Sequence, residues 1–73
     1  MPRKGSAGIG RAVARLREAK GWSQQQLAEA AGLSQPYVSK VESGAREPSL
    51  VVVQALARAL GVKVDELLRE DEA

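Results

Sequence analysis

The 73 residues fit a single domain with one activity, because domains typically hold about 100 to 200 residues. The chain has no Cys and no His, so we expect no disulfide, metal centre or cofactor, and no catalysis by a thiol or an imidazole. The composition is 44% hydrophobic and 27% charged, which indicates a folded domain. A domain this small buries only about 60% of its unfolded surface, so we expect it to gain stability as a homodimer.

The net charge of +2 conceals a gradient along the chain. Residues 1–20 hold six basic side chains against one acidic one, whereas residues 49–73 hold three basic against five acidic ones. A basic end suits a polyanion such as nucleic acid, although a solvated helix face explains the same charges. No stretch approaches the roughly 20 apolar residues of a membrane span, and residues 1–10 lack the apolar middle of a secretory signal. We therefore expect a cytoplasmic protein.

Helical periodicity and capping residues predict five short helices and no strand. Apolar residues at every third or fourth position predict a first helix from about residue 8 to residue 20. Ser23, followed three residues later by Gln26, is typical of a capping box, so a second helix begins there. Trp22 is placed to pack against Leu27 as a hydrophobic staple, which is a structural role rather than one in ligand binding.

Glycine, serine and proline mark the third helix. Gly32 ends the second helix, and Ser34 caps a third one that has Pro36 as its second residue and runs to about Ser43. The turn between the two helices is therefore tight.

The fourth helix begins after Ser49 and ends at Gly61. Its apolar face is expected to consist of Leu50, Val53, Leu56, Ala57 and Leu60. A short fifth helix follows around residues 65–69. The chain then divides into a flexible basic arm (residues 1–8), a folded domain (9–69) and an acidic tail (70–73).

The second and third helices carry the residues of a helix-turn-helix. Two short helices that pack steeply around a turn need a small residue where their backbones approach, a glycine at the turn and branched apolar residues beneath. These residues are Ala28, Gly32, Val38 and Val41. The opposite face of the third helix is left without an apolar partner inside the domain and is free to bind. Its residues are Gln35, Tyr37, Ser39 and Lys40.

The chain resembles the lambda-repressor-like helix-turn-helix family in the run LREAKGWSQQQLAEAAGLSQPYVSKVESGAREPS, in LARALGV and in DELL. That family includes phage repressors and Cro proteins, restriction-modification controllers and many antitoxins. The resemblance covers residues 9–68 and implies an all-α fold of five helices with the helix-turn-helix at helices 2 and 3. It also implies a sequence-specific regulator of transcription that binds double-stranded DNA, most simply a dimeric repressor of a palindromic operator.

Side-chain chemistry and the resemblance together predict the base contacts. Gln35 comes first, because its amide can pair with adenine N6 and N7 and the matching family position commonly reads a base; an exposed first-turn residue is the alternative. Pro36 offers only apolar contact with a thymine methyl, which departs from the polar residue often found in relatives. Tyr37 and Ser39 carry hydroxyls for a base or a phosphate, and Lys40 donates to guanine or to a phosphate.

Phosphate contacts are expected on both flanks of the third helix, from Gln24, Ser34, Ser43, the Gly44 amide and Arg46. Gln24 resembles the phosphate-gripping Gln of the family. Arg3 and Lys4 either wrap the duplex or belong to a disordered tail. Arg17 and Glu42 match the family's internal ion pair, which would tie the first helix to the end of the third without touching DNA.

Candidates for a dimer interface are Val51, Val52, Ala55, Ala59, Val64 and Leu68, with a monomer that has a mildly apolar surface as the alternative. Three other functions stay open: an antitoxin with a toxin partner for acidic residues 65–72, a restriction-modification controller, and a protein-bridging module with weak DNA affinity. An enzyme is not expected, because no motif pairs a serine with Lys40 or Lys63 as its base.

Overall fold

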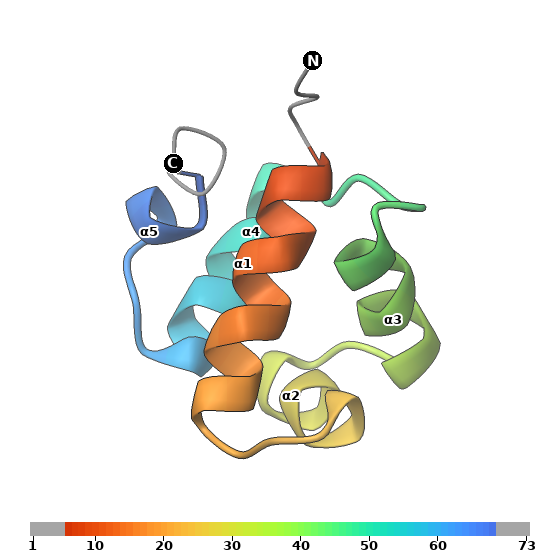
Figure 1. Cartoon of the computed structure of the whole chain (residues 1–73), viewed down its shortest axis with the longest axis vertical. Coiled ribbons are helices and arrows are strands. Elements are labelled where there is room, and N and C mark those ends of the chain that lie inside the picture. The colour runs from red at the N-terminus through yellow and green to blue at the C-terminus, as the bar shows by residue number, and fades with distance from the viewer. Residues whose placement is uncertain (1–5, 69–73) are drawn as a thin grey trace.

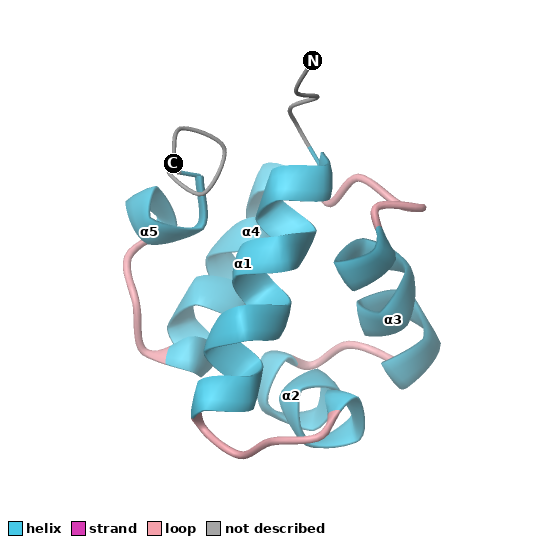
Figure 2. Cartoon of the chain, in the orientation of Figure 1, coloured by secondary structure: helices cyan, strands magenta, loops and turns pink. Residues whose placement is uncertain are grey.

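The computed structural model describes residues 6–68, and these form five helices and no strand. The helices are α1 (Ser6–Ala19), α2 (Gln24–Ala31), α3 (Gln35–Ser43), α4 (Leu50–Leu60) and α5 (Val64–Leu68). In Figure 1, α3 lies on one side of α1 and α5 on the opposite side, with α2 at the lower end of the molecule. Figure 2 shows that short loops join the helices. The predicted all-α fold of five helices is confirmed.

The three central helices begin and end in the same way. Each begins after a serine whose hydroxyl accepts a hydrogen bond from the amide three residues ahead: Ser23, Ser34 and Ser49. Ser23 and Gln26 form the complete predicted capping box, in which the Ser23 amide also donates to Gln26 Oε1 at 2.8 Å. Gly32, with a φ of 74°, ends α2 in the left-handed conformation that favours glycine, so only three residues separate α2 from α3.

The core lies between the helices and is made of aliphatic side chains. The buried members are Ala12, Val13, Leu27, Ala28, Val38, Val41, Val53, Leu56, Ala57, Leu60 and Leu67. No polar or charged residue within the described part of the chain is fully buried. Trp22 packs partly against this core, and Lys20 Nζ lies 4.9 Å from the centroid of its ring. The predicted packing role of Trp22 is in keeping with this position.

Two predictions about helix ends need correction. α1 begins at Ser6, so residues 6–8 belong to that helix and not to an arm; residues 1–5, Arg69 and the acidic tail 70–73 lie outside the described residues. Leu50 is 64% exposed, so its predicted place on the core face of α4 is wrong. A helical side chain covers the turn that precedes it, and Leu50, as the first residue of α4, has no such turn to cover.

At Gly10, α1 lies against the backbone of α3. A Cβ atom at this buried position would collide with the backbone carbonyl oxygens of Val41 and Glu42. Only a residue without a side chain therefore lets α1 lie against the C-terminal end of α3. The sequence patterns did not predict this contact between α1 and the C-terminal end of α3.

Candidate functional site

One face of α3 points away from the rest of the protein. Val38 and Val41 are buried, whereas Pro36 and Lys40 are exposed and Gln35 and Ser39 are partly exposed. α3 lies along one side of the molecule in Figure 1, with α1 beside it at the centre and α2 below. The helix is therefore anchored by its valines and presents a short polar surface.

The prediction that Tyr37 lacks an apolar partner is wrong. Its ring packs partly against the core, and the Arg46 guanidinium carbon lies 5.5 Å from the ring centroid. A cation at this distance is attracted by the face of an aromatic ring. Tyr37 thus holds Arg46, which is itself exposed, beside the C-terminal end of α3.

Arg17 of α1 and Glu42 of α3 form an ion pair with two hydrogen bonds. Arg17 Nε donates to Glu42 Oε2 at 2.7 Å, and Nη2 donates to Oε1 at 3.0 Å. The side chains are 12% and 7% exposed, respectively. Arg17 Nη1 also donates to the carbonyl oxygen of Trp22 at 2.8 Å, and Nη2 lies 3.6 Å from a carboxylate oxygen of Glu18. The hydrogen bond with Glu42 is the main cause that raises the pKa of Arg17 above its ordinary value, so the guanidinium stays charged.

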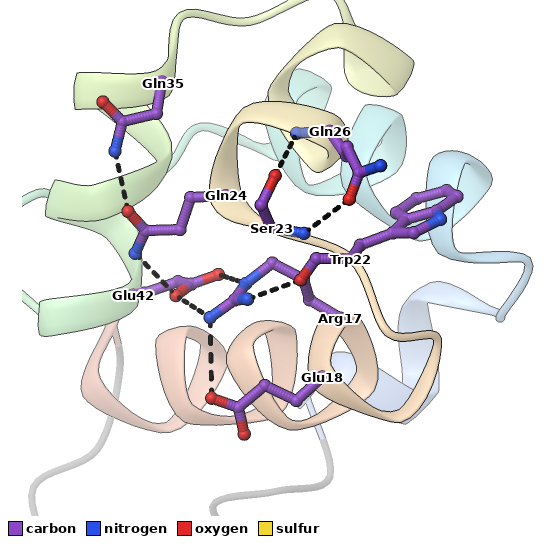
Figure 3. Close-up of polar contacts among 8 residues, drawn as sticks. All are labelled: Arg17, Glu18, Trp22, Ser23, Gln24, Gln26, Gln35 and Glu42. Atoms are coloured by element: carbon purple, nitrogen blue, oxygen red, sulfur yellow. Dashed lines mark hydrogen bonds and ion pairs between the residues drawn. The ribbon is translucent and has the colours of Figure 1, made fainter.

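A row of hydrogen bonds leads from this ion pair to the start of α3 (Figure 3). Gln24 Nε2 donates to Glu42 Oε1 at 3.0 Å, and Gln24 Oε1 accepts from Gln35 Nε2 at 2.7 Å. We call these four residues, Arg17, Glu42, Gln24 and Gln35, the polar chain. Gln24, predicted to grip a phosphate, therefore has both ends of its amide already bonded within the protein, with one N–H left over.

The amides that follow α3 are used within the protein. The Gly44 amide, predicted to grip a phosphate, caps α3 by donating to the Lys40 and Val41 carbonyls. The Ala45 and Arg46 amides donate to the Lys40 carbonyl at 2.9 and 3.1 Å. Ser43 Oγ donates to the same carbonyl at 3.1 Å. The amides of residues 44–46 are therefore engaged, and the exposed side chains of Arg46 and Lys40 remain to contact an anion.

The residues predicted for a dimer interface are unequally exposed. Val51 is 73% exposed and Leu68 is 48% exposed, and Ala55 is partly exposed. Val52, Ala59 and Val64 pack partly against the core. Exposed apolar side chains are therefore found at the start of α4, where Leu50 joins them, and at the end of α5.

Residues 6–68 hold no group of His, Cys, Asp or Glu side chains arranged to bind a metal ion. Within the same range, no helix has the length and apolar character needed to cross a membrane.

Comparison with known proteins places these features in a family. The sequence model described as helix-turn-helix matches residues 13–67. The HTH-type transcriptional regulator y4dJ of Sinorhizobium fredii is 42% identical over 60 residues, which cover 82% of this chain and 78% of that protein. The chain spans only 36% to 54% of the length of several other curated regulators and repressors.

Two solved structures show the same arrangement of helices. The restriction-modification controller protein C.AhdI from Aeromonas hydrophila is 44% identical, with a TM-score of 0.82 and coverage of 85% of this chain and 94% of that one. SinR from Bacillus subtilis, the master regulator for biofilm formation, was solved in complex with DNA. It is 34% identical, with a TM-score of 0.78 and coverage of 82% of this chain and 97% of that one.

Proposed function

The chain belongs to the helix-turn-helix family of transcriptional regulators, and from this premise we propose that it binds double-stranded DNA sequence-specifically with α3 in the major groove. The observation that carries the proposal is the outward polar face of α3, held in place by the packing of α1 and α2 behind it. An α-helix fits the major groove, where each base pair presents its own pattern of donors and acceptors. No step of this function needs a catalytic group, a metal or a cofactor.

We assign the contacts by chemistry and position. Gln35, Pro36, Ser39 and Lys40 would read base edges from the exposed side of α3, and the hydroxyl of Tyr37 would supplement them. Phosphate contacts would come from the Ser34 and Arg46 side chains and from the remaining N–H of Gln24. The Ser43 hydroxyl would have to give up its hydrogen bond to the Lys40 carbonyl before it could donate to a phosphate. Binding experiments can tell these two groups of contacts apart, because phosphate contacts strengthen binding to every DNA sequence whereas base contacts select among sequences.

We also propose that two copies bind together as a cytoplasmic repressor of a palindromic operator. A single small module on one half-site binds weakly, whereas two recognition helices about 34 Å apart enter successive major grooves. The exposed Val51 and Leu68 are apolar side chains that such a pair can cover.

Selection from a pool of random duplexes, followed by sequencing, tests the function. We expect a palindromic consensus with half-site centres about 10 base pairs apart, and affinity that falls steeply with salt, because each neutralised phosphate releases counterions. Gln35→Ala should relax the preference at one position per half-site, at a cost of roughly 1 to 3 kcal/mol. Equal weakening on all sequences would place Gln35 among the phosphate contacts. Failure of the unaltered protein to enrich any sequence would contradict the proposed function itself.

The similarity to C.AhdI favours one narrower candidate, a controller of a restriction-modification system, because that protein matches this chain over 94% of its own length. The selected consensus distinguishes this candidate. A controller would require matching sites upstream of genes for a nuclease and a methyltransferase.

A further inference from the structure

The polar chain fixes which way the Gln35 amide faces. A carboxylate can only accept hydrogen bonds, and Glu42 Oε1 already accepts from Arg17 at 3.0 Å. The group of Gln24 that lies 3.0 Å from the same oxygen must therefore be its NH2. The Gln24 oxygen is then turned toward Gln35, and it can only be met by the NH2 of Gln35, at 2.7 Å.

This orientation limits what Gln35 can offer to a base. One N–H of its Nε2 is used by Gln24, so one N–H and the carbonyl oxygen remain for a ligand. Adenine presents one acceptor and one donor in the major groove, N7 and N6, which match this remaining pair. Guanine presents two acceptors, N7 and O6, so one of them would face the Gln35 oxygen.

We infer that the Arg17–Glu42 ion pair, acting through Gln24, sets the base preference of Gln35 to adenine over guanine (Figure 3). Glu42 and Gln24 are then positioning residues for specificity, although neither needs to touch the base. The inference rests on the proposed function, because it requires Gln35 to lie against a base pair.

The ion pair suits this role because its own orientation is unambiguous. Gln24 and Gln35 are amides, which can turn over and exchange donor for acceptor, whereas the guanidinium has only donors and the carboxylate only acceptors. Hydrogen bonds to an ionised group are roughly twice as strong as those between neutral groups. The charged end of the polar chain therefore determines the direction of the neutral end.

Gln24→Leu tests the inference by removing the amide while the ion pair stays in place. Selection from random duplexes should show a preference for adenine over guanine of roughly tenfold at the position lost in Gln35→Ala, and less than about threefold in Gln24→Leu. Gln25→Leu is the matched control, because Gln25 lies in the same turn of α2, is exposed and donates only to Glu29 at 3.0 Å. The control should keep the full preference.

Glu42→Gln tests whether residue 42 determines which atoms of Gln24 and Gln35 donate and which accept in the polar chain. The new amide is expected to keep its oxygen on Arg17 Nε, where the present bond is the shorter one at 2.7 Å, and to turn its NH2 toward Gln24. Gln24 and then Gln35 would each turn over, so that Gln35 presents its NH2 to the groove. The preference should therefore move from adenine toward guanine, with circular dichroism used to confirm that the variant is folded.

The possible outcomes test this inference independently of the proposed function. An adenine preference that stays intact in Gln24→Leu, with all duplexes weakened equally, would overturn the inference and leave Gln24 only its proposed phosphate contact. An unchanged adenine preference in folded Glu42→Gln would overturn it as well, as would a Gln35→Ala variant whose consensus equals that of the unaltered protein. In these three cases the unaltered protein still selects a consensus, so the proposed function stands.

Discussion

Arg17 and Glu42 join two elements that are far apart in the sequence, and their stabilising effect depends on both partners being present. The two side chains are 12% and 7% exposed, so removal of one charge leaves the other nearly buried without its counter-charge. Because the pKa of Arg17 is raised, the arginine loses its proton, and with it the ion pair, only at a pH above the ordinary pKa of arginine. Substitution, and not titration of the arginine, is therefore the practical test of this pair.

Arg17→Met should lower the free energy of unfolding by about 2 to 4 kcal/mol, measured by denaturant titration, because Glu42 is then left unpaired. The double variant Arg17→Met with Glu42→Leu should recover most of that loss, since no nearly buried charge remains. A double variant as unstable as the single one would contradict the view that the stranded charge causes the loss. If our inference holds, the recovered double variant should lack the adenine preference, because no carboxylate then orients the Gln24 amide.

At the level of elements, α1 and α3 depend on Gly10 for their close approach. In most helix interiors, Gly→Ala stabilises a protein by about 0.5 to 1 kcal/mol, because alanine loses less conformational freedom. Here the added methyl group would meet two backbone carbonyl oxygens, which cannot rotate away as a side chain can. Whether Gly10→Ala lowers or raises the stability of the protein therefore shows whether the packing of α1 against α3 requires a glycine at this position.

Gly10→Ala should reduce thermal and denaturant stability by about 1 to 3 kcal/mol, as overpacking of a close contact does. DNA affinity should fall with it, because α3 would have to move. Increased stability on this substitution would show that α1 and α3 do not meet as closely as described.

Features governed by neighbouring residues were predictable from the sequence. The serine caps, the glycine ends and the Ser23–Gln26 capping box each depend on residues within four positions, and the bounds of α2, α3 and α4 agree with them. The Arg17–Glu42 pair was expected only from a family resemblance. The Gln24–Glu42 and Gln24–Gln35 bonds join residues 18 and 11 positions apart, and the Gly10 contact joins two helices, so no local pattern could indicate them.

At the scale of the whole molecule, α3 and α5 lie on opposite sides of α1 in Figure 1. A pair of copies joined through exposed residues of α4 and α5 would leave both recognition helices uncovered. Val51 is the better position to test, since it is 73% exposed, whereas Val52 packs partly against the core.

Val51→Glu should shift the protein from dimer toward monomer in sedimentation equilibrium, because the charge would have to be buried at the interface. Gln54→Glu places the same charge at another exposed position of α4 and should leave the mass unchanged. A dimer that survives Val51→Glu would remove this surface from the interface. Loss of dimer in both variants would point to general charge repulsion.

Some side chains of α3 are exposed, whereas others are hydrogen-bonded to the interior of the domain. This difference affects which of them can be replaced when such a regulator acquires a new DNA target. Pro36 and Lys40 are exposed, so their replacement changes the surface of the domain while leaving its interior alone. Gln35 is bonded through Gln24 to a nearly buried carboxylate, so a new residue there disturbs the interior as well. Lineages that acquire new operators should therefore vary first at Pro36 and Lys40 and keep Gln35.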